Sequence, residues 1–181
     1  MTESSIQLAV APSASMAASF KELYEQHRQA VYSWARRYCG SDSAEAEDLT
    51  SEVFIRLFRS MAKIDAPRAG AWLHRVTANL AISRSRARNS LLNRLRAVFF
   101  ERPHPHHPIA VLEAREEMTN VIEELDRLPT RERVAVCMKL VDGMTQSQIA
   151  EELALSQGHD SKLLARGFAR LRELGWELPD V

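Results

Sequence analysis

Three prolines within six residues divide a chain whose pattern is otherwise helical. They are Pro103, Pro105 and Pro108, and each one lacks a backbone N–H donor and collides with the preceding helical turn. On both sides of them apolar residues recur at three-and-four spacing, which predicts amphipathic α-helices. No strand-like alternation appears in the sequence. We therefore predict an all-α protein, with two small helical domains joined by a flexible linker.

Periodicity and composition divide the 181 residues into four segments. Residues 1–19 are rich in alanine, serine and threonine and lack the basic start and long apolar centre of a secretion signal, so we expect a disordered tail. Helical domains are expected over residues 20–92 and 111–181, with a linker over residues 93–110. Because no run of eighteen apolar residues occurs, we expect no insertion into a membrane.

Three helices are predicted in the first domain. Gly40 ends the first helix, since glycine commonly stands just after a helix, and Ser43 begins the second with a capping-box pattern. A loop follows at Ile64–Pro67, and the third helix begins near Gly70. The side chains expected on the inner faces are Phe20, Leu23, Tyr24, His27, Val31, Trp34, Ala35 and Tyr38, then Leu49, Val53, Leu57 and Met61, then Trp72, Leu73, Val76 and Leu80.

The second domain has the pattern of a helix-turn-helix module. Gly143–Thr145 separates an entry helix from the helix Gln146–Leu153, and the turn Ala154–Gly158 leads into a basic helix. Such modules lay their last helix in the DNA major groove, although a helical hairpin that binds no DNA has the same pattern. The expected inner side chains are Val134, Cys137, Met138, Val141, Ile149, Ala150, Leu153, Leu163 or Leu164, Gly167 or Phe168, and Leu171; the last helix exposes His159, Ser161, Lys162, Arg166 and Arg170.

Charge is unevenly distributed although the net charge of the chain is zero. Residues 66–102 carry eight arginines against one acid, Glu101, whereas residues 45–58 carry a net charge of −3 and residues 113–132 a net charge of −4. Such segregation indicates separate faces for separate partners. We expect a polyanion on the basic faces and a protein on the acidic ones.

Arginines dominate the outer face predicted for the third helix. Arg84, Arg86 and Arg88 have no acid between them, and guanidinium groups match phosphate oxygens in geometry. A solvated helix face is the alternative. Asn79, one turn earlier, either contacts an exposed base edge or braces the loop at Ile64–Arg68.

Acidic residues line one stripe of the second helix. Glu45, Asp48 and Glu52 are spaced by three and four residues, which can suit metal binding or acid/base chemistry. No histidine or second carboxylate pair on another helix matches them, as metal sites in helical bundles require. The stripe is therefore either a solvated face or a docking surface for a basic partner.

Other residue types that could carry chemistry have simpler interpretations. His104, His106 and His107 lie among prolines that splay their side chains, which favours a linker over a metal site. Cys39 and Cys137 form no CxxC pair, which favours two buried thiols over a redox switch. No glycine-rich phosphate loop, nucleophile elbow or Ser/His/Asp arrangement is present. We expect no metal, no cofactor and no enzymatic activity.

The predicted linker can span a long distance. Its eighteen residues reach ~60 Å when stretched but average only ~25 Å as a free coil. Because stretching costs entropy, we expect a partner that holds the two domains apart.

Two sets of motifs, in this order along the chain, resemble a known family. Ala46–Leu49, Glu52–Phe54, Trp72–Leu73 and Asn79 ahead of the arginines look like region 2 of extracytoplasmic-function (ECF) sigma factors. Leu128–Pro129, Arg133, Gly143–Thr145, Ile149–Ala150, Leu153 and Ser156–Gly158 look like region 4 of the same family. Outside the linker, the resemblance extends from about Phe20 to Leu174.

The resemblance implies a cytoplasmic subunit of bacterial RNA polymerase that selects promoters and is controlled by an anti-sigma factor. Region 2 would bind the clamp of the largest polymerase subunit and hold the melted minus-ten element of promoter DNA, with one base extruded from the stack. Region 4 would lay its last helix in the minus-35 element. The residues implied are Glu45, Asp48 and Glu52 for polymerase, Arg68, Arg75, Asn79, Arg84, Arg86 and Arg88 for minus-ten DNA, and Gln157, His159, Ser161, Lys162, Arg166 and Arg170 for minus-35 DNA.

The chain departs from the family pattern at three places. Ser83 stands where the family usually has aspartate, Gln148 where it has glutamate, and Gly158–Leu163 replaces a Gly-Thr-Val-basic-Ser-Arg run. Within that run, Asp160 would bring a negative charge near the phosphates. Two other functions are therefore compatible with the sequence: a regulator that binds duplex DNA by itself, and an adaptor that binds polymerase or an anti-sigma factor without promoter selectivity.

Overall fold

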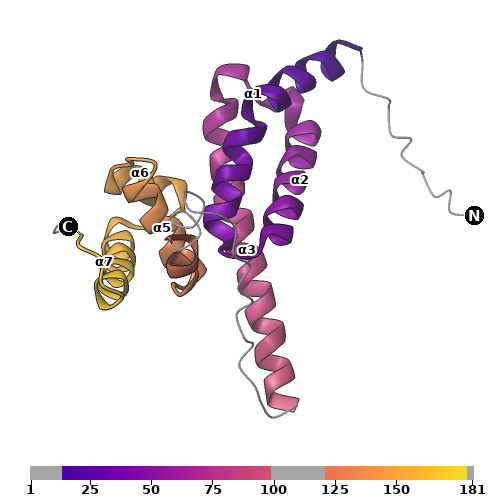
Figure 1. Cartoon of the computed structure of the whole chain (residues 1–181). Helices are drawn as coiled ribbons and strands as arrows, with labels where there is room; N and C mark the ends of the chain where they lie inside the picture. Colours follow the sequence, from indigo (N-terminus) through magenta and orange to yellow (C-terminus); the bar gives the residue numbers. More distant parts are fainter. Residues whose placement is uncertain (1–13, 99–120, 179–181) are drawn as a thin grey trace, which may run out of the picture.

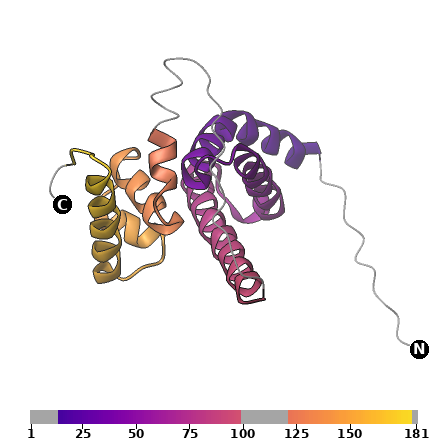
Figure 2. The same ribbon diagram turned by 60° about the horizontal axis from the view of Figure 1, so that its bottom comes forward.

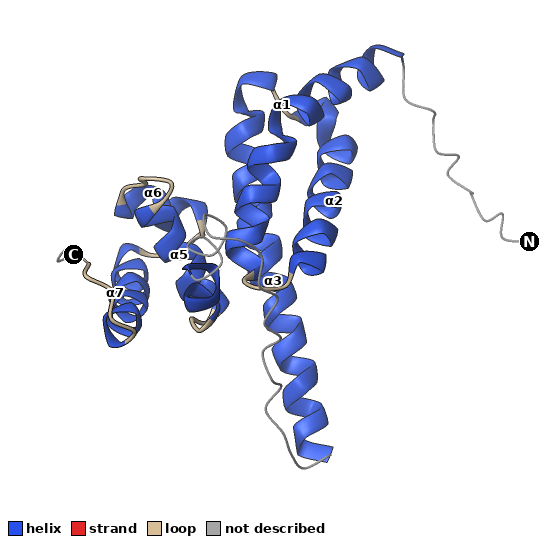
Figure 3. Ribbon diagram, viewed as in Figure 1, coloured by secondary structure: helices blue, strands red, loops and turns tan. Residues whose placement is uncertain are grey.

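The computed structural model describes residues 14–98 and 121–178, apart from the side chains of residues 14–15, 91–98 and 157. This part of the chain consists of helices joined by loops and turns, with no strand (Figure 3). The all-α prediction is thus confirmed for the described residues. Figure 1 shows two groups of helices, one from each half of the sequence.

The first group contains α1 (Ala14–Cys39), α2 (Ser43–Ser60) and α3 (Ala69–Val98). These helices lie side by side, and α3 extends beyond the other two (Figure 1). Nine of the sixteen predicted inner side chains are buried and Tyr24 is exposed. The other six are half-buried: Phe20, His27, Trp34, Met61, Trp72 and Val76. The fully buried side chains that join the three helices include Val31, Ala35, Tyr38, Leu49, Val53, Leu57 and Leu73.

Both ends of this group are more helical than predicted. α1 begins at Ala14, within the predicted disordered tail, and α3 continues through Val98, past the predicted start of the linker at Asn93. These stretches contain alanine, methionine, leucine and arginine, which favour helix, and no proline or glycine interrupts them. The predictions for residues 1–13 and 99–120, with the histidines at 104, 106 and 107, lie outside the described residues.

Loop chemistry sets the starts of α2 and α3. Gly40 ends α1 as predicted, with a φ of +76°, a left-handed conformation that costs glycine little. The cap of α2 is Asp42 rather than Ser43, because its Oδ1 accepts a hydrogen bond from the Glu45 N–H at 2.9 Å. One 3₁₀ turn, η1 (Met61–Lys63), precedes the loop predicted at Ile64–Pro67, and a second, η2 (Ala66–Arg68), overlaps the end of that loop.

The second group contains a helical segment over residues 121–126, α5 (Thr130–Leu140), α6 (Gln146–Glu152) and α7 (Gln157–Glu173). α7 packs closely on α5 at Gly167, where a Cβ atom would lie 2.6 Å from Cγ2 of Val136. The prediction that Val141 is buried was wrong: its side chain is 57% exposed because it follows the last helical residue of α5. The buried side chains include Val134, Cys137, Met138, Ile149, Leu163, Leu164, Phe168 and Leu171.

Helix ends within this group follow the helix-turn-helix prediction with a small shift. Gly143, with a φ of +66°, separates α5 from α6. Thr145 and Gln148 form a complete capping box at the start of α6: the Gln148 Oε1 accepts from the Thr145 N–H at 2.8 Å, and the Thr145 Oγ1 accepts from the Gln148 N–H at 3.3 Å. α7 begins at Gln157, inside the predicted turn, and Ala154 supplies the sharp bend with a φ of +50°.

The two groups touch each other. α1 and α3 lie against α5, and the two views of the ribbon agree on this arrangement (Figures 1 and 2). Ser41 donates a hydrogen bond to Asp126 at 2.8 Å, and Thr130 donates one to Ser85 at 2.8 Å. The chain alone therefore holds its halves in contact, whereas the stretched linker was predicted for a chain bound to a partner.

Candidate nucleic-acid interface

The start of α3 and the turn before it present polar side chains to solvent. Arg68 ends η2, and Arg75 and Asn79 follow on α3; all three are exposed. Residues four apart share one face of a helix, so Arg75 and Asn79 lie on the same face. These are three of the residues that the family resemblance implied for minus-ten DNA.

The three arginines of the cluster on α3 do not share one face of the helix. Arg84 is half-buried and its Nη2 donates to the backbone carbonyl of Asp48 at 3.5 Å, while the Arg88 Nη1 lies 2.6 Å from the Glu45 Oε2. Because 84 and 88 are one turn apart, both arginines reach toward α2. Arg86 lies about 200° around the helix from each of them and is exposed.

The acidic stripe of α2 is partly satisfied within the chain. Glu45 pairs with Arg88, and Glu52 pairs with Arg56 on its own helix at 2.9 Å. The hydrogen bond from Arg56 holds the pKa of Glu52 below its usual value. Asp48 is exposed, so it is the acid of the stripe that solvent reaches most fully.

The outer face of α7 presents the side chains predicted for duplex DNA. His159, Ser161, Lys162 and Arg166 are exposed. Gln146 on α6 donates to the Ser161 Oγ at 2.9 Å, which couples the two helices of the module. Arg170 is exposed too, but its Nε lies 3.0 Å from the buried carboxylate of Glu132, so it also ties α7 to α5. The side chain of Gln157 lies outside the described ones.

Two residues that depart from the family pattern, Asp160 and Leu163, have side chains buried inside the domain. The prediction that Asp160 brings its charge near the DNA was wrong, because this side chain is fully buried. Burial raises the pKa of Asp160, against the opposing influence of Lys139. Leu163 is also buried. The altered residues that remain on the surface of α7 are therefore His159, Ser161 and Lys162.

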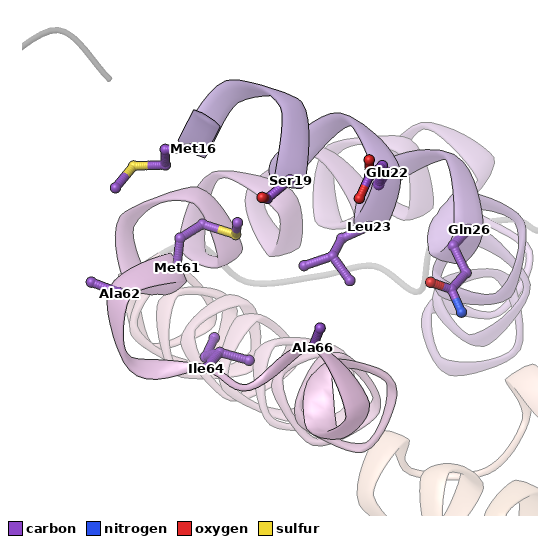
Figure 4. Close-up of a pocket in the computed structure, with 9 residues that line it drawn as sticks. All are labelled: Met16, Ser19, Glu22, Leu23, Gln26, Met61, Ala62, Ile64 and Ala66. Atoms are coloured by element: carbon purple, nitrogen blue, oxygen red, sulfur yellow. The ribbon is translucent and has the colours of Figure 1, made fainter. Parts of the chain in front are cut away.

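A pocket borders the 3₁₀ turns before α3. α1 forms one of its walls and the segment 61–66 the other (Figure 4). Apolar side chains from both walls face it, among them Leu23 and Ile64, with polar groups at its α1 side. Its lining consists of Met16, Ser19, Glu22, Leu23, Gln26, Met61, Ala62, Ile64 and Ala66.

A buried polar network between the two halves was not predicted. His74, which is 8% exposed, lies between carboxylates of the second half: its Nδ1 is 3.0 Å from the Glu152 Oε1 and its Nε2 is 3.4 Å from the Asp142 Oδ2. Arg37 binds the same Asp142 at 2.8 Å. One signal was present in the sequence, since His74 shares the inner face of α3 with Ala78 and Ala81 at helical spacing. Its partners Asp142 and Glu152 lie 68 and 78 residues further along the chain, and no sequence pattern pointed to them.

Both cysteines are buried and free, and burial raises the pKa of each thiol to about 12. Within residues 14–98 and 121–178, no group of three or more acidic, histidine or cysteine side chains is arranged to hold a metal ion. In the same part of the chain, no helix combines the length and apolar character needed to cross a bilayer.

Comparison with known families matches both halves. The profile for "Sigma-70 region 2" matches residues 23–96, and the profile for "Sigma-70, region 4" matches residues 125–173. The first match contains α2 and most of α3, and the second contains the whole helix-turn-helix module.

Individual relatives agree with these profiles. The chain is 31% identical over 157 residues to the ECF RNA polymerase sigma factor SigE of Mycolicibacterium smegmatis, an alignment that covers 86% of this chain and 61% of that protein. It is 25% identical over 169 residues to the ECF RNA polymerase sigma factor SigW of Bacillus subtilis, covering 86% of this chain and 88% of that one. The chain thus spans less than two thirds of the first of these relatives.

A solved structure shares the fold. It is the sigma factor RpoE of Bartonella quintana in complex with the anti-sigma factor NepR, which is 21% identical with a TM-score of 0.63 and covers 86% of this chain and 96% of that one. The profile matches, the relatives and this fold agree with the motifs found in the sequence. The chain belongs to the sigma-70 family and, within it, to the extracytoplasmic-function sigma factors.

Proposed function

We propose that the protein directs core RNA polymerase to a set of promoters by binding the minus-ten element through region 2 and the minus-35 element through region 4. The presence of both regions in one chain, in the family's order, carries this proposal. As a sigma factor the protein is a regulatory subunit and not an enzyme. It would act in the cytoplasm, where polymerase and the chromosome are found.

Region 2 offers two surfaces for this role. Arg68, Arg75, Asn79 and Arg86 are exposed and can contact the backbone or bases of an opened strand. The pocket beside the 3₁₀ turns is a candidate site for an unstacked base (Figure 4). On α2, the exposed carboxylate of Asp48, with Glu45 and Glu52 beside it, is proposed to face the polymerase clamp.

Region 4 would read duplex DNA through α7. The residues near the start of a recognition helix contact base edges, which here are His159, Ser161 and Lys162, and Arg166 would contact phosphate. Because Asp160 is buried, its carboxylate does not lie on the surface that the phosphates would approach. An anti-sigma partner is proposed because the structurally similar RpoE is bound to one.

Transcription with purified components tests this function. Adding the chain to core polymerase should produce transcripts with defined 5′ ends, and the chain alone should bind the same promoters poorly. No affinity for core polymerase would reject the proposal. Tight binding of the chain alone to a palindromic duplex would identify an independent regulator. Binding to polymerase without selective initiation would identify an adaptor.

A further inference from the structure

Opposite charges form one part of the contact between the two halves. Arg37, at the end of α1, and Arg75, on α3, belong to region 2; Asp142, after α5, and Glu151 and Glu152, on α6, belong to region 4. The Arg37 Nη2 lies 2.8 Å from the Asp142 Oδ1, and only 17% and 16% of these side chains are exposed. The Arg75 Nη2 lies 3.1 Å from the Glu152 Oε2 and 3.5 Å from the Glu151 Oε1.

His74 completes the set as a third cation. Burial by itself would lower the pKa of His74, but its hydrogen bonds with Asp142 and Glu152 outweigh burial and raise it to about 9. The protonated ring can donate from Nδ1 to Glu152 at 3.0 Å and from Nε2 to the Tyr38 hydroxyl at 2.8 Å. Tyr38 in turn donates to Asp142 at 3.3 Å. Three cationic side chains of region 2 therefore face three carboxylates of region 4.

One of these contacts involves a residue of the candidate DNA surface. Arg75 is among the region 2 residues proposed to hold the minus-ten element. In this structure its guanidinium group forms ion pairs with two carboxylates of α6. A carboxylate and a phosphate offer the same kind of oxygen pair to arginine. Glu151 and Glu152 therefore compete with the backbone of a nucleic acid for the same side chain.

We propose that Asp142, Glu151 and Glu152 of region 4 form a latch with Arg37, His74 and Arg75 of region 2, that the latch keeps the isolated chain closed, and that it opens when the protein engages polymerase and promoter DNA. That the latch opens on binding polymerase and promoter DNA rests on the proposed function. Separating the halves exposes both sets of charges to water at once, so neither is left buried and unpaired, which is the costly outcome for an ion pair. The latch can therefore open without unfolding either region.

Energy transfer between two dyes on the full chain tests the latch. Ser51→Cys on α2 and Ala169→Cys on α7 provide exposed attachment sites, while Cys39 and Cys137 are buried. The chain with intact charges should show efficient transfer at neutral pH. Asp142→Asn with Glu152→Gln, which removes two carboxylates of the latch, should lose transfer while circular dichroism shows unchanged helicity.

Glu123→Gln with Glu173→Gln is the matched control, because it removes two exposed acids of the second group of helices outside the latch. Its transfer should equal that of the intact chain. If the first double variant loses helicity, His74→Gln with Arg75→Gln removes the latch from the region 2 side and should open the chain in the same way. Equal transfer in the intact chain and in a folded latch variant would overturn the proposal.

A pH titration and a DNA titration add two independent readouts. The groups that face His74 are Tyr38 and Arg37 from α1, Asp142 after α5, Glu152 from α6, and Arg75 on its own helix. Transfer in the intact chain should fall as the pH rises through about 9, and a flat profile counts against the latch.

Adding core polymerase with promoter DNA should also abolish transfer. If the chain is closed but does not bind polymerase, the proposed function fails and the latch stands; if it initiates transcription but is open throughout, the latch fails alone.

Discussion

At the scale of single residues, His74 shows how a buried histidine can stay charged. Its carboxylate partner on α6 is Glu152. Burial would raise the pKa of the Glu152 carboxyl, but hydrogen bonds from His74 and Arg75 lower that pKa below its usual value. Each partner thus keeps the other ionised. The pair depends on the contact between regions 2 and 4, because His74 belongs to region 2 and Glu152 to region 4.

We expect the His74 ring to titrate at about pH 9 in the folded chain. Since this pKa is raised above the unfolded value, the stabilisation from a protonated His74 is complete below about pH 6.5 and is lost as the pH rises through about 9. An NMR titration of the histidine ring signals measures this directly. Glu152→Gln should lower the pKa of His74, whereas Glu151→Gln, which removes an exposed carboxylate that contacts Arg75 instead, should change it much less.

Gly167 allows α7 to lie close to α5, and this can be tested by adding one methyl group. Gly167→Ala would place a Cβ 2.6 Å from Val136, and overpacking of this kind costs about 1–3 kcal/mol. Gly158→Ala on the same helix is the control, because nothing lies within 4 Å of its Cβ position and alanine favours helix. Thermal unfolding should show a lower midpoint for Gly167→Ala only. Similar midpoints for both variants would mean that the α5–α7 contact adjusts without cost.

At the scale of elements, side-chain caps set where helices begin. Gln148 stands where the family usually has glutamate, yet it forms the complete capping box with Thr145. The capping role needs only a side-chain acceptor at this position, and an amide oxygen supplies it without the charge. This departure from the family pattern therefore leaves the start of α6 intact.

Removing the cap should destabilise region 4. Thr145→Ala deletes the hydroxyl that accepts from Gln148, and loss of such a cap costs roughly 0.5–2 kcal/mol. Gln148→Glu keeps an acceptor at the same place and should unfold at the same urea concentration as the natural sequence. An unchanged urea midpoint for Thr145→Ala would show that the box does not stabilise α6.

The turn of α3 places Arg84 and Arg88, which reach α2, on a different face of the helix from Arg86. Arg86→Ala should remove a phosphate contact and flatten the slope of log K against log salt by about 0.7 for single-stranded or about 0.9 for duplex DNA. Arg88 is paired with Glu45, so Arg88→Ala should change that slope less. Binding of the polymerase complex to promoter DNA at several salt concentrations measures both. An unchanged slope for Arg86→Ala would remove that residue from the DNA face.

At the scale of the whole molecule, the buried apolar side chains of the described regions, apart from Ala150, belong to one cluster. We therefore expect the intact chain to unfold in a single calorimetric transition at neutral pH, because each half stabilises the other. Opening the latch with Asp142→Asn and Glu152→Gln should separate this into two transitions. Two transitions in the intact chain would indicate that the halves fold independently even when they touch.

The local parts of this protein were largely predictable. Three-and-four periodicity predicts the helices that bury Val31, Leu49 and Leu73, and Gly143 marks the break before α6. Errors fell at helix ends, as at Ala14, Asp42 and Val98, because capping and fraying depend on a few local contacts. The burial of Asp160 was not predicted, since a charged residue near the start of a basic helix gives no sign that its carboxylate is buried.

The sequence by itself determined the all-α class, the two sigma regions and the exposed arginine and recognition-helix residues, because these follow from spacing and residue type within short stretches. Only the tertiary structure decided that Arg84 and Arg88 reach α2, that Asp160 points inward, and that Asp142 and Glu152 meet His74. Such pairings join residues far apart in the chain, and no local pattern specifies them. They are set by how whole helices pack, and that packing also decides which of the charged side chains remain available to a partner.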